Sequence, residues 1–386
     1  MAMDLSGNPS ALDISAHHPD VLQERKTDVT IKHQRVSEFL EDTQYDALLL
    51  GMPEGFSWFT SGGNSSHGLS SRGYAAVFVS RDKRQVIASN VESGRLFQEE
   101  IGGLGFELVE YAWQDSLASV YKRLFGNRHV ASDTGVEGTT GVNDQLKHLR
   151  LVLTPLERQR LRELGREVSY SIETTARVVP QGVTESVIAG EVARRLIKRS
   201  ITPCEILVAG DDRSAQYRRP VFSDHVIQRY CMIAVYGQRN GLCAGATRCF
   251  SFGEPEKPYR KRFELACMVD ATSIYYSRPG ESFQTIFEHV KRVFKRYNRP
   301  NEWTICDQGG VMGTHPTELV ATPDSAFHLA SNMAVSWCPT VGSARSQDTV
   351  LIDDQGFEIV TRVHRWPNNK VKVKGCNVTR PGLLVR

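Results

Sequence analysis

The sequence contains few cysteines, and none in the spacing that builds a metal-binding or redox motif. Its 386 residues hold eight cysteines, all beyond residue 200, and no Cys-x-x-Cys pair. This argues against a zinc ribbon and against a thioredoxin-like site. Scattered thiols are typical of small core residues in a reducing compartment.

A secretory leader and long apolar runs are also missing. Residues 1–20 show no basic start followed by an apolar run, and no stretch approaches the ~20 apolar residues of a membrane-spanning helix. The net charge of +3 is too small to indicate a general polyanion-binding role. We therefore expect a cytoplasmic protein without a membrane or nucleic-acid partner.

The composition that remains, 40% hydrophobic and 24% charged, is that of a globular protein long enough for two domains. Residues 1–28 are polar and predict a flexible arm. Strands alternating with helices predict an α/β domain over residues 29–153. A second domain follows over residues 154–386, and its basic tail, from about residue 366, predicts either an interaction strand or an ordered strap.

Local signals define the start of the second domain and one of its hairpins. Thr154, Pro155 and Glu157 predict the N-cap, first position and capping box of a long helix. Farther along, Asn240-Gly241 joins two apolar strands and predicts a tight hairpin turn. Residues 136–153, before the long helix, are expected to be a connector.

The most informative stretch, residues 303–352, combines glycines with polar side chains. Gly309-Gly310 allows a sharp turn and the close approach of another group, so the stretch predicts one wall of a binding site. Its motifs are Asp307-Gln308-Gly309-Gly310, Gly313-Thr314, Glu318, Trp337-Cys338-Pro339 and Ser346-Gln347-Asp348-Thr349.

In these motifs the chain resembles the creatinase, prolidase and aminopeptidase P ("pita-bread") family. A bacterial branch of that family reads His-Gln-Gly-Gly, Gly-Tyr, Glu, Trp-Asn-Pro and Ser-Glu-Asp-Thr. The resemblance implies an α/β (α+β) fold: a creatinase-type N-terminal domain that helps build a homodimer, and a pita-bread domain with a curved antiparallel sheet.

The resemblance also implies where metal-dependent relatives hold their two ions. Four of those five ligand positions fall on Val235, Gly245, Asp307 and Gln347, and the fifth falls in residues 337–339, where no carboxylate occurs. Two hard cations need several carboxylate oxygens, and only Asp307 offers one. We expect no metal and no other cofactor.

Three residues are candidate catalytic groups: Asp307, His315 and Glu318. Asp307 is either a base or anchor for an amine, or a cap of the glycine turn. His315 and Glu318 are three residues apart, the spacing of an acid/base pair on a helix, although Pro316 argues against a regular helix there. The resemblance implies substrate contact for Glu318.

Six further residues are candidate binding groups: Tyr217, Arg219, Arg248, Gln308, Trp337 and Gln347. Arg219 can clamp a carboxylate or phosphate, or form a surface ion pair. The resemblance implies that Arg248 supports the site through a buried pair with Asp348. Cys338 becomes a nucleophile only beside a base or a positive field; otherwise it is a core residue.

Three functions remain open. The first is a metal-independent hydrolase or lyase acting on a small amino-acid-derived or guanidino compound, as in creatinase. The second is a non-catalytic homologue that binds a peptide or protein partner. A metal-dependent Xaa-Pro peptidase is the least favoured, because the ligand positions lack donors.

Overall fold

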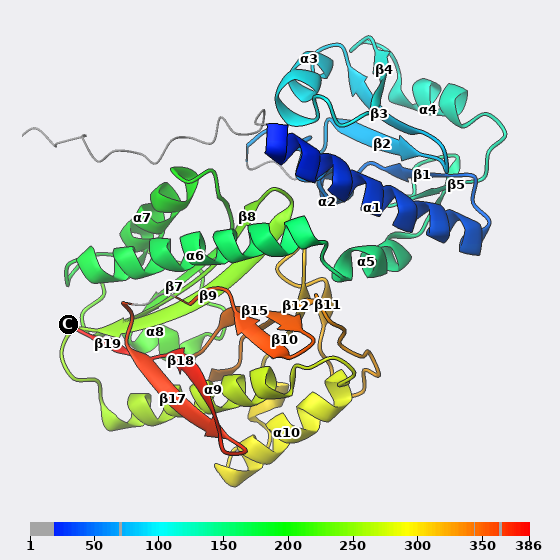
Figure 1. Ribbon diagram of the computed structural model, residues 1–386. Helices are drawn as coiled ribbons and strands as arrows, with labels where there is room; N and C mark the ends of the chain where they lie inside the picture. The colour runs from blue at the N-terminus through cyan, green and yellow to red at the C-terminus, as the bar shows by residue number, and fades with distance from the viewer. Residues whose placement is uncertain (1–18, 69–71, 343, 363–364) are drawn as a thin grey trace, which may run out of the picture. The chain divides into compact units, whose positions relative to one another are not determined.

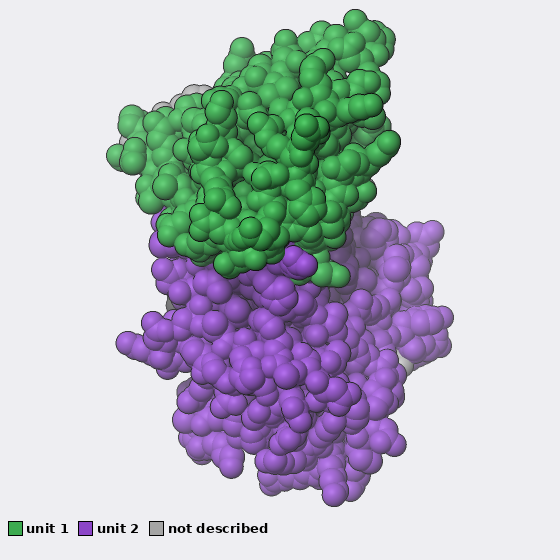
Figure 2. Space-filling view, turned by 90° about the vertical axis from the view of Figure 1, so that its right-hand side faces the viewer, with its two compact units in different colours: residues 1–144 green, residues 145–386 purple. Residues whose placement is uncertain are grey.

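The computed structural model describes residues 19–68, 72–342, 344–362 and 365–386. It divides into two compact units, Met1–Asp144 and Gln145–Arg386 (Figure 2). Each unit has its own sheets and its own buried hydrophobic residues. The predicted mixed α/β fold is therefore present.

Unit 1 is built on one six-stranded sheet with the order β4-β3-β2-β1-β5-β6. The central pairs β1–β2 and β2–β3 are antiparallel, whereas the outer pairs are parallel. Its strands are β1 Ala47–Leu50, β2 Ala75–Val79, β3 Arg84–Ser89, β4 Glu107–Tyr111, β5 Val130–Ser132 and β6 Thr139–Gly141. Its helices are α1 Pro19–Thr43, α2 Pro53–Phe59, α3 Ser93–Arg95 with a π-helical turn at Leu96–Glu100, and α4 Leu117–Phe125.

Helix α1 corrects the prediction of a flexible arm over residues 1–28, because residues 19–28 are helical. Residues 1–18 lie outside the described part of the chain. The arm was predicted from polarity, but three polar residues of α1, Arg25, Asp28 and Lys32, are buried. Arg25 donates to the carbonyls of Thr60, Ser61 and Glu100, so polar contacts hold a helix that shows no apolar stripe at this end.

Helix α5 Asn143–Leu151, most of which belongs to unit 2, lies where a connector was predicted. Leu151 is buried in the unit 2 core, and Arg150 forms an ion pair with Glu318. The backbone N–H of Leu153 donates to Asn332. These contacts attach the residues before Thr154 to unit 2, whereas the sequence placed the boundary at 153/154.

The capping box of the long helix α6 Pro155–Val178 is present as predicted. Thr154 accepts from the backbone of Glu157, and the Glu157 carboxylate accepts from the backbone of Thr154. α7 Glu185–Ile197 follows α6. Among the described residues, no helix is long and apolar enough to cross a membrane.

The strands of unit 2 form two main sheets, of order β19-β9-β8-β7 and β11-β10-β12-β15-β16 (Figure 1). The β8–β9 hairpin turns at Asn240-Gly241 as predicted. Strands of the first sheet are β7 Thr202–Gly210, β8 Tyr230–Arg239, β9 Leu242–Ser251 and β19 Leu384–Val385. The second sheet comprises β10 Gly309–Met312, β11 Leu319–Val320, β12 Ala334–Trp337, β15 Asp348–Asp353 and β16 Gly356–Ile359.

The remaining elements of unit 2 are short strands and helices around these sheets. The basic tail is an ordered hairpin, β17–β18, followed by β19, so the strap alternative holds for residues 368–385. These elements are α8 Asp211–Gln216, α9 Lys257–Tyr276, α10 Phe283–Arg296, a 3-10 turn at Glu302–Thr304, β13 Thr340–Val341, β14 Ala344–Arg345, β17 Asn368–Val373 and β18 Cys376–Pro381.

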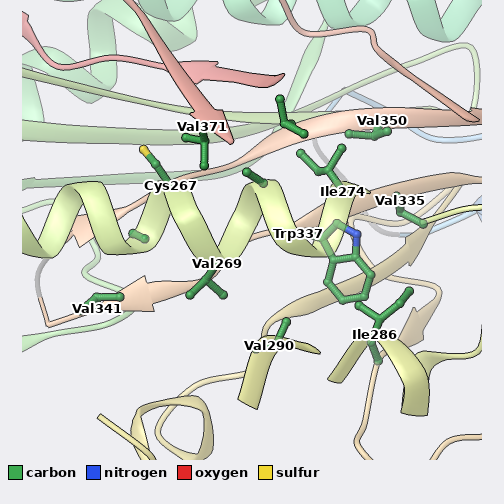
Figure 3. Close-up of a cluster of buried hydrophobic side chains, with 14 of the residues drawn as sticks. Cys267, Val269, Ile274, Ile286, Val290, Val335, Trp337, Val341, Val350 and Val371 are labelled. Atoms are coloured by element: carbon green, nitrogen blue, oxygen red, sulfur yellow. The ribbon is translucent and has the colours of Figure 1, made fainter. Parts of the chain in front are cut away.

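Helices α9 and α10 pack side by side and contribute to a core around Trp337 (Figure 3). The indole is fully buried, donates to the Ser277 hydroxyl over 2.8 Å, and meets the Phe283 ring edge-on. Trp337 and Val335 alternate with Ser336 along β12, so the two faces of this strand differ. One is apolar and faces the helices; the other carries the polar site described next.

Candidate functional site

A buried polar cluster, here called the central cluster, lies where β8, β9, β12 and the β14–β15 segment meet. It consists of Tyr236, Thr247, Ser336, Arg345 and Gln347. The Gln347 carboxamide oxygen accepts from the Thr247 hydroxyl over 2.9 Å and from Arg345 over 3.0 Å, and its NH₂ donates to Ser336 over 3.1 Å. All five side chains are buried. Gln347 therefore acts as the hub of a closed hydrogen-bond network.

The ring of Tyr236 fills space left by the missing side chain of Gly245, its partner across the β8–β9 hairpin. A Cβ atom on Gly245 would lie only 2.3 Å from the Tyr236 ring and 2.9 Å from the Gln347 NH₂ group. Burial raises the pKa of the Tyr236 phenol well above its usual value. The ring is thus a neutral filler of the cluster.

Arg345 is a buried cation without an acidic partner. Its side chain is 3% exposed, and in the described part of the chain no carboxylate lies within 4 Å of it. Its Nε–H has no acceptor. Burial opposes the charge, but the pKa of Arg345 is nevertheless raised overall from its ordinary value, so the guanidinium stays protonated. The central cluster is consequently positive.

Asp307 and Arg219 form an ion pair at the edge of this region. Both side chains are partly exposed, 32% for Asp307 and 54% for Arg219. The thiol of Cys338 lies 3.8 Å from the Asp307 carboxylate, and its ionisation is also coupled to Arg345. Cys338 thus lies between the exposed pair and the central cluster. Burial raises the pKa of its thiol to about 12, so it is protonated at neutral pH.

Glu318 is held by a different set of partners. It pairs with Arg150 at 3.2 Å and accepts from the backbone of Thr314 and of His315. Burial raises the pKa of Glu318, but Arg150 and Thr314 lower it by more. His315 donates its backbone N–H to Glu318. The pKa of the Cys204 thiol is lowered by a hydrogen bond with Cys243 and, to a smaller extent, by the His315 imidazole. The contacts of Glu318 do not include Asp307 or Arg219, so the three predicted catalytic residues do not form one group.

Arg248 forms the buried pair with Asp348 that was expected of it, at 2.9 Å. It also pairs with Glu173 at 2.7 Å and donates to the carbonyl of Thr361. With its side chain 2% exposed, Arg248 has no free face for a ligand. It supports the strands from behind the cluster instead of binding substrate.

Two predicted binding residues lie away from the central cluster. Trp337 points into the apolar core between α9 and α10 (Figure 3), and this corrects its assignment to the site. Tyr217 is half exposed at the end of α8, where Arg213 lies over its ring. Gln308 is fully buried and donates to the Cys306 carbonyl, while its own carboxamide oxygen has no partner.

The glycine pair serves strand packing and not a ligand. A Cβ atom on Gly309 would lie 2.0 Å from the Ser336 carbonyl oxygen, and one on Gly310 would lie 2.0 Å from that of Leu319. The group that approaches these glycines is therefore the backbone of β12 and β11. The sequence predicted one wall of a binding site at Gly309-Gly310, whereas the structure has neighbouring strands packed closely against both glycines.

The donor set does not fit a divalent metal. Among the described residues, no group of three or more histidine, cysteine, aspartate or glutamate side chains is placed to hold one. In the central cluster the candidate donors are a phenol, hydroxyls and an amide, and Arg345 carries a positive charge 3.0 Å from the amide oxygen. Hard cations take several carboxylate oxygens, and a neighbouring guanidinium repels them.

Comparisons with known proteins identify what the fold resembles. Residues 159–354 match metallopeptidase family M24. A Staphylococcus aureus (strain MW2) protein named as an uncharacterized peptidase is 20% identical, with 86% of this chain and 99% of that protein covered. Both findings agree with the resemblance seen in the motifs.

Solved structures show the same fold. The prolidase from Pyrococcus horikoshii OT3 superimposes with a TM-score of 0.74 at 16% identity, covering 86% of this chain and 99% of that one. The N-terminal domain of the FACT complex subunit SPT16 from chickpea (Cicer arietinum) gives a TM-score of 0.68 at 12% identity, covering 89% and 97%. The predicted pita-bread fold is confirmed.

Sequence reasoning missed Tyr236, Ser336 and Arg345 as members of the site. Arg345 lies two residues before Gln347, and since alternate residues of an extended segment share a face, that spacing was an available signal. No comparable signal existed for Tyr236, because it enters the cluster only by facing Gly245 across the hairpin.

Proposed function

Because this chain belongs to metallopeptidase family M24, we propose that it is a metal-independent member that binds a short peptide or small amino-acid-derived molecule without hydrolysing it. The content of the central cluster carries the proposal. A tyrosine ring, a neutral amide and an unpaired guanidinium occupy positions where a hydrolytic metal centre needs anionic oxygen ligands.

The residues that remain are poor catalysts. The Cys338 thiol is protonated, since burial raises its pKa to about 12, and a thiolate is the nucleophilic form. Glu318 is ionised and held by Arg150, so it is not poised to donate a proton. Asp307, a candidate base, is tied to Arg219.

The Asp307–Arg219 pair supports binding of a zwitterionic ligand. The two side chains are the partly exposed charges beside the cluster, and they present an anion and a cation next to each other. A ligand with an amine and a carboxylate matches both, its amine bonding to Asp307 and its carboxylate to the guanidinium. Short peptides and amino-acid-derived molecules carry both groups.

The fold is compatible with a role other than peptide hydrolysis. The chickpea SPT16 domain, which shares it, is described as part of a complex subunit and not as a peptidase. Identity of 12% extends this comparison to the fold alone. It supports a binding role only by showing that the fold occurs outside peptidases.

The second candidate is a metal-independent hydrolase or lyase acting on a guanidino compound. One observation favours it: an exposed carboxylate, Asp307, lies within 3.8 Å of a thiol and in contact with a guanidinium. In this case Asp307 would bind the guanidino group of the substrate in place of Arg219. Turnover of guanidino compounds by the purified protein would separate this candidate from the binding role.

Metal analysis combined with a Xaa-Pro dipeptide assay tests metal independence. We expect substoichiometric manganese, zinc and iron after purification from metal-supplemented medium, and no dipeptide hydrolysis with added manganese. Stoichiometric metal with manganese-dependent turnover would overturn the proposal.

A thermal-shift screen of dipeptides, imino acids and guanidino compounds tests the binding role. We expect a stabilising ligand whose effect is lost in Arg219→Gln and kept in Arg292→Gln, an exposed arginine of α10 paired with Glu288. A ligand shift that Arg219→Gln leaves unchanged would contradict the assignment of the binding site to the Asp307–Arg219 pair.

A further inference from the structure

A separate pocket lies at the C-terminal end of α6, where the last strand of the chain returns to that helix (Figure 1). Its volume is about 400 Å³, within the range of small-molecule sites. It shares no residue with the central cluster. The lining residues are Arg177, Arg365, Trp366, Pro367, Leu384 and Arg386.

Three arginines and no aspartate or glutamate line this pocket. None of Arg177, Arg365 and Arg386 forms an ion pair with an acidic side chain of the described residues. Other arginines of unit 2 do, including Arg162 with Glu358 and Arg260 with Glu254. The pocket therefore brings together three cationic side chains without an acidic side chain.

Neutral acceptors fix two of the three guanidinium groups. Arg386 donates to the carbonyls of Ala176 and Val179 at the end of α6, over 3.0 and 2.6 Å. Arg177 donates to the backbone carbonyl of Arg365. Because these acceptors are neutral carbonyl groups, they orient the guanidinium groups without neutralising their positive charge. The side chain of Arg365 is exposed, with no hydrogen-bond partner in the described residues.

Aromatic rings stiffen the base of the pocket. Trp366 is 4% exposed and donates its indole N–H to the Gly382 carbonyl over 2.9 Å. The Arg177 guanidinium lies 5.6 Å from the centre of the Trp366 ring, and that of Arg386 lies 5.3 Å from the Phe252 ring. Cation–π contacts of this kind hold the charges in position before a ligand arrives.

The nearest acidic group on α6 is already committed. Glu173, one turn before Arg177, pairs with Arg248 at 2.7 Å inside the unit, although the charge of Arg177 still lowers its pKa against the larger effect of burial. It does not line the pocket. No acidic side chain of the lining therefore balances the three arginines, and an external anion would do so.

We propose that this pocket binds a small molecule carrying two or more phosphate groups. Arginine binds phosphate oxygens through two parallel hydrogen bonds, and guanidinium groups converging from three chain segments match several phosphates better than one. The pocket is open to solvent, and its volume of about 400 Å³ has room for a compact oligophosphate. The net charge of +3 gives no general preference for a nucleic acid.

Isothermal titration of the full chain with inorganic tripolyphosphate, pyrophosphate, phosphate and citrate tests the proposal. We expect one tripolyphosphate per chain, with affinity falling as phosphate groups are removed. Citrate distinguishes carboxylates from phosphates. Tighter binding of citrate, or binding of an oligonucleotide in the absence of tripolyphosphate binding, would overturn the assignment.

Arg365→Gln is the most direct variant, because its side chain makes no hydrogen bond with the residues that the structure describes. It should weaken tripolyphosphate binding by about tenfold, the loss of one charge-assisted contact, without changing the thermal midpoint. Arg292→Gln on α10 is the matched control and should bind normally. Equal affinities of Arg365→Gln and the unsubstituted chain would refute the proposal. Arg386 is not a suitable test position, since it also caps α6.

Discussion

At the scale of single residues, two buried arginines of unit 2 differ in their surroundings. Arg248 has two carboxylate partners, Glu173 and Asp348. Arg345 has none among the described residues, and its hydrogen-bond partner is the amide of Gln347. Burying a charge is costly unless it is paired, so the two arginines should contribute oppositely to stability.

Replacing each arginine by methionine tests this difference. Arg248→Met should lower the free energy of unfolding by roughly 3–5 kcal/mol, because it leaves the buried Glu173 carboxylate without its partner and removes one of the two arginines paired with Asp348. Arg345→Met should change it by less than about 1 kcal/mol or increase it, since no acid is left behind. Urea denaturation of both variants measures the comparison. If Arg345→Met is as destabilising as Arg248→Met, then the central cluster requires its positive charge for folding.

Residue identity also decides how far the site could be predicted. The lack of a carboxylate or imidazole metal ligand at Val235, Gly245 and Gln347 could be read from the sequence, and so could the Arg248–Asp348 pair. The place of Trp337 could not. It depends on which face of β12 meets α9 and α10. All four residues of this short strand are buried, and its single serine does not indicate which face the helices cover.

At the scale of elements, the middle strands of the second sheet pack unusually close. β10 lies between β11 and β12, and glycines occupy both contact positions. Gly310→Ala would place a methyl group 2.0 Å from the Leu319 carbonyl oxygen. We expect a loss of roughly 3 kcal/mol or more in unfolding free energy, since backbone atoms cannot move aside as a side chain can.

Gly190→Ala provides the control for that substitution. Gly190 lies in α7, and nothing lies within 4 Å of the position its Cβ would take. Alanine there should raise stability by about 0.5–1 kcal/mol through its helix propensity. Thermal unfolding of the two variants gives the comparison, and a stable Gly310→Ala protein would show that β11 can separate from β10.

Elements with strong local signals were predicted well. The α6 capping box and the Asn240-Gly241 turn are set by residues close together in sequence. The start of α1 and the whole of α5 were missed. Both are stabilised by partners far along the chain, such as the carbonyl of Glu100 for Arg25, which a local pattern does not contain.

At the scale of the molecule, a buried network of ion pairs links two helices and one strand of unit 2. Arg248 and Arg380 contact three carboxylates on three elements: Glu173 on α6, Asp270 on α9 and Asp348 on β15. The network has three carboxylates but only two guanidinium groups, so binding of a proton by one carboxylate is favoured. Burial raises the pKa of Asp270 from 3.8 to about 6, and Arg380 only partly offsets this.

The stability should therefore depend on pH through Asp270. Because the folded pKa is the higher one, its contribution is complete below about pH 4 and is lost as the pH rises through about 6. The shift corresponds to roughly 3 kcal/mol. The difference in unfolding free energy between the unsubstituted chain and Asp270→Asn should fall by about this amount over that range. A difference that is flat with pH would mean that Asp270 does not titrate there.

The boundary between the two units also predicts how fragments behave. A fragment 143–386 keeps α5, with Arg150 paired to Glu318 and Leu151 in the core. A fragment 154–386, the domain expected from the sequence, leaves the Glu318 carboxylate buried and unpaired. We expect the longer fragment to unfold cooperatively and the shorter one to be less stable by at least about 3 kcal/mol, as measured by circular dichroism in urea. Equal stability would place α5 outside the folding unit.

The predicted homodimer stays a prediction.

The contact between Tyr236 and Gly245 restricts which substitutions this protein can accept at these two positions. An aspartate introduced at residue 245 alone would collide with the Tyr236 ring, and removing the ring alone would leave a hole in a buried network. A carboxylate-rich ion site at this place would need several coordinated substitutions, each harmful by itself. Under the proposed metal-independent function, such a site is therefore difficult to acquire one mutation at a time.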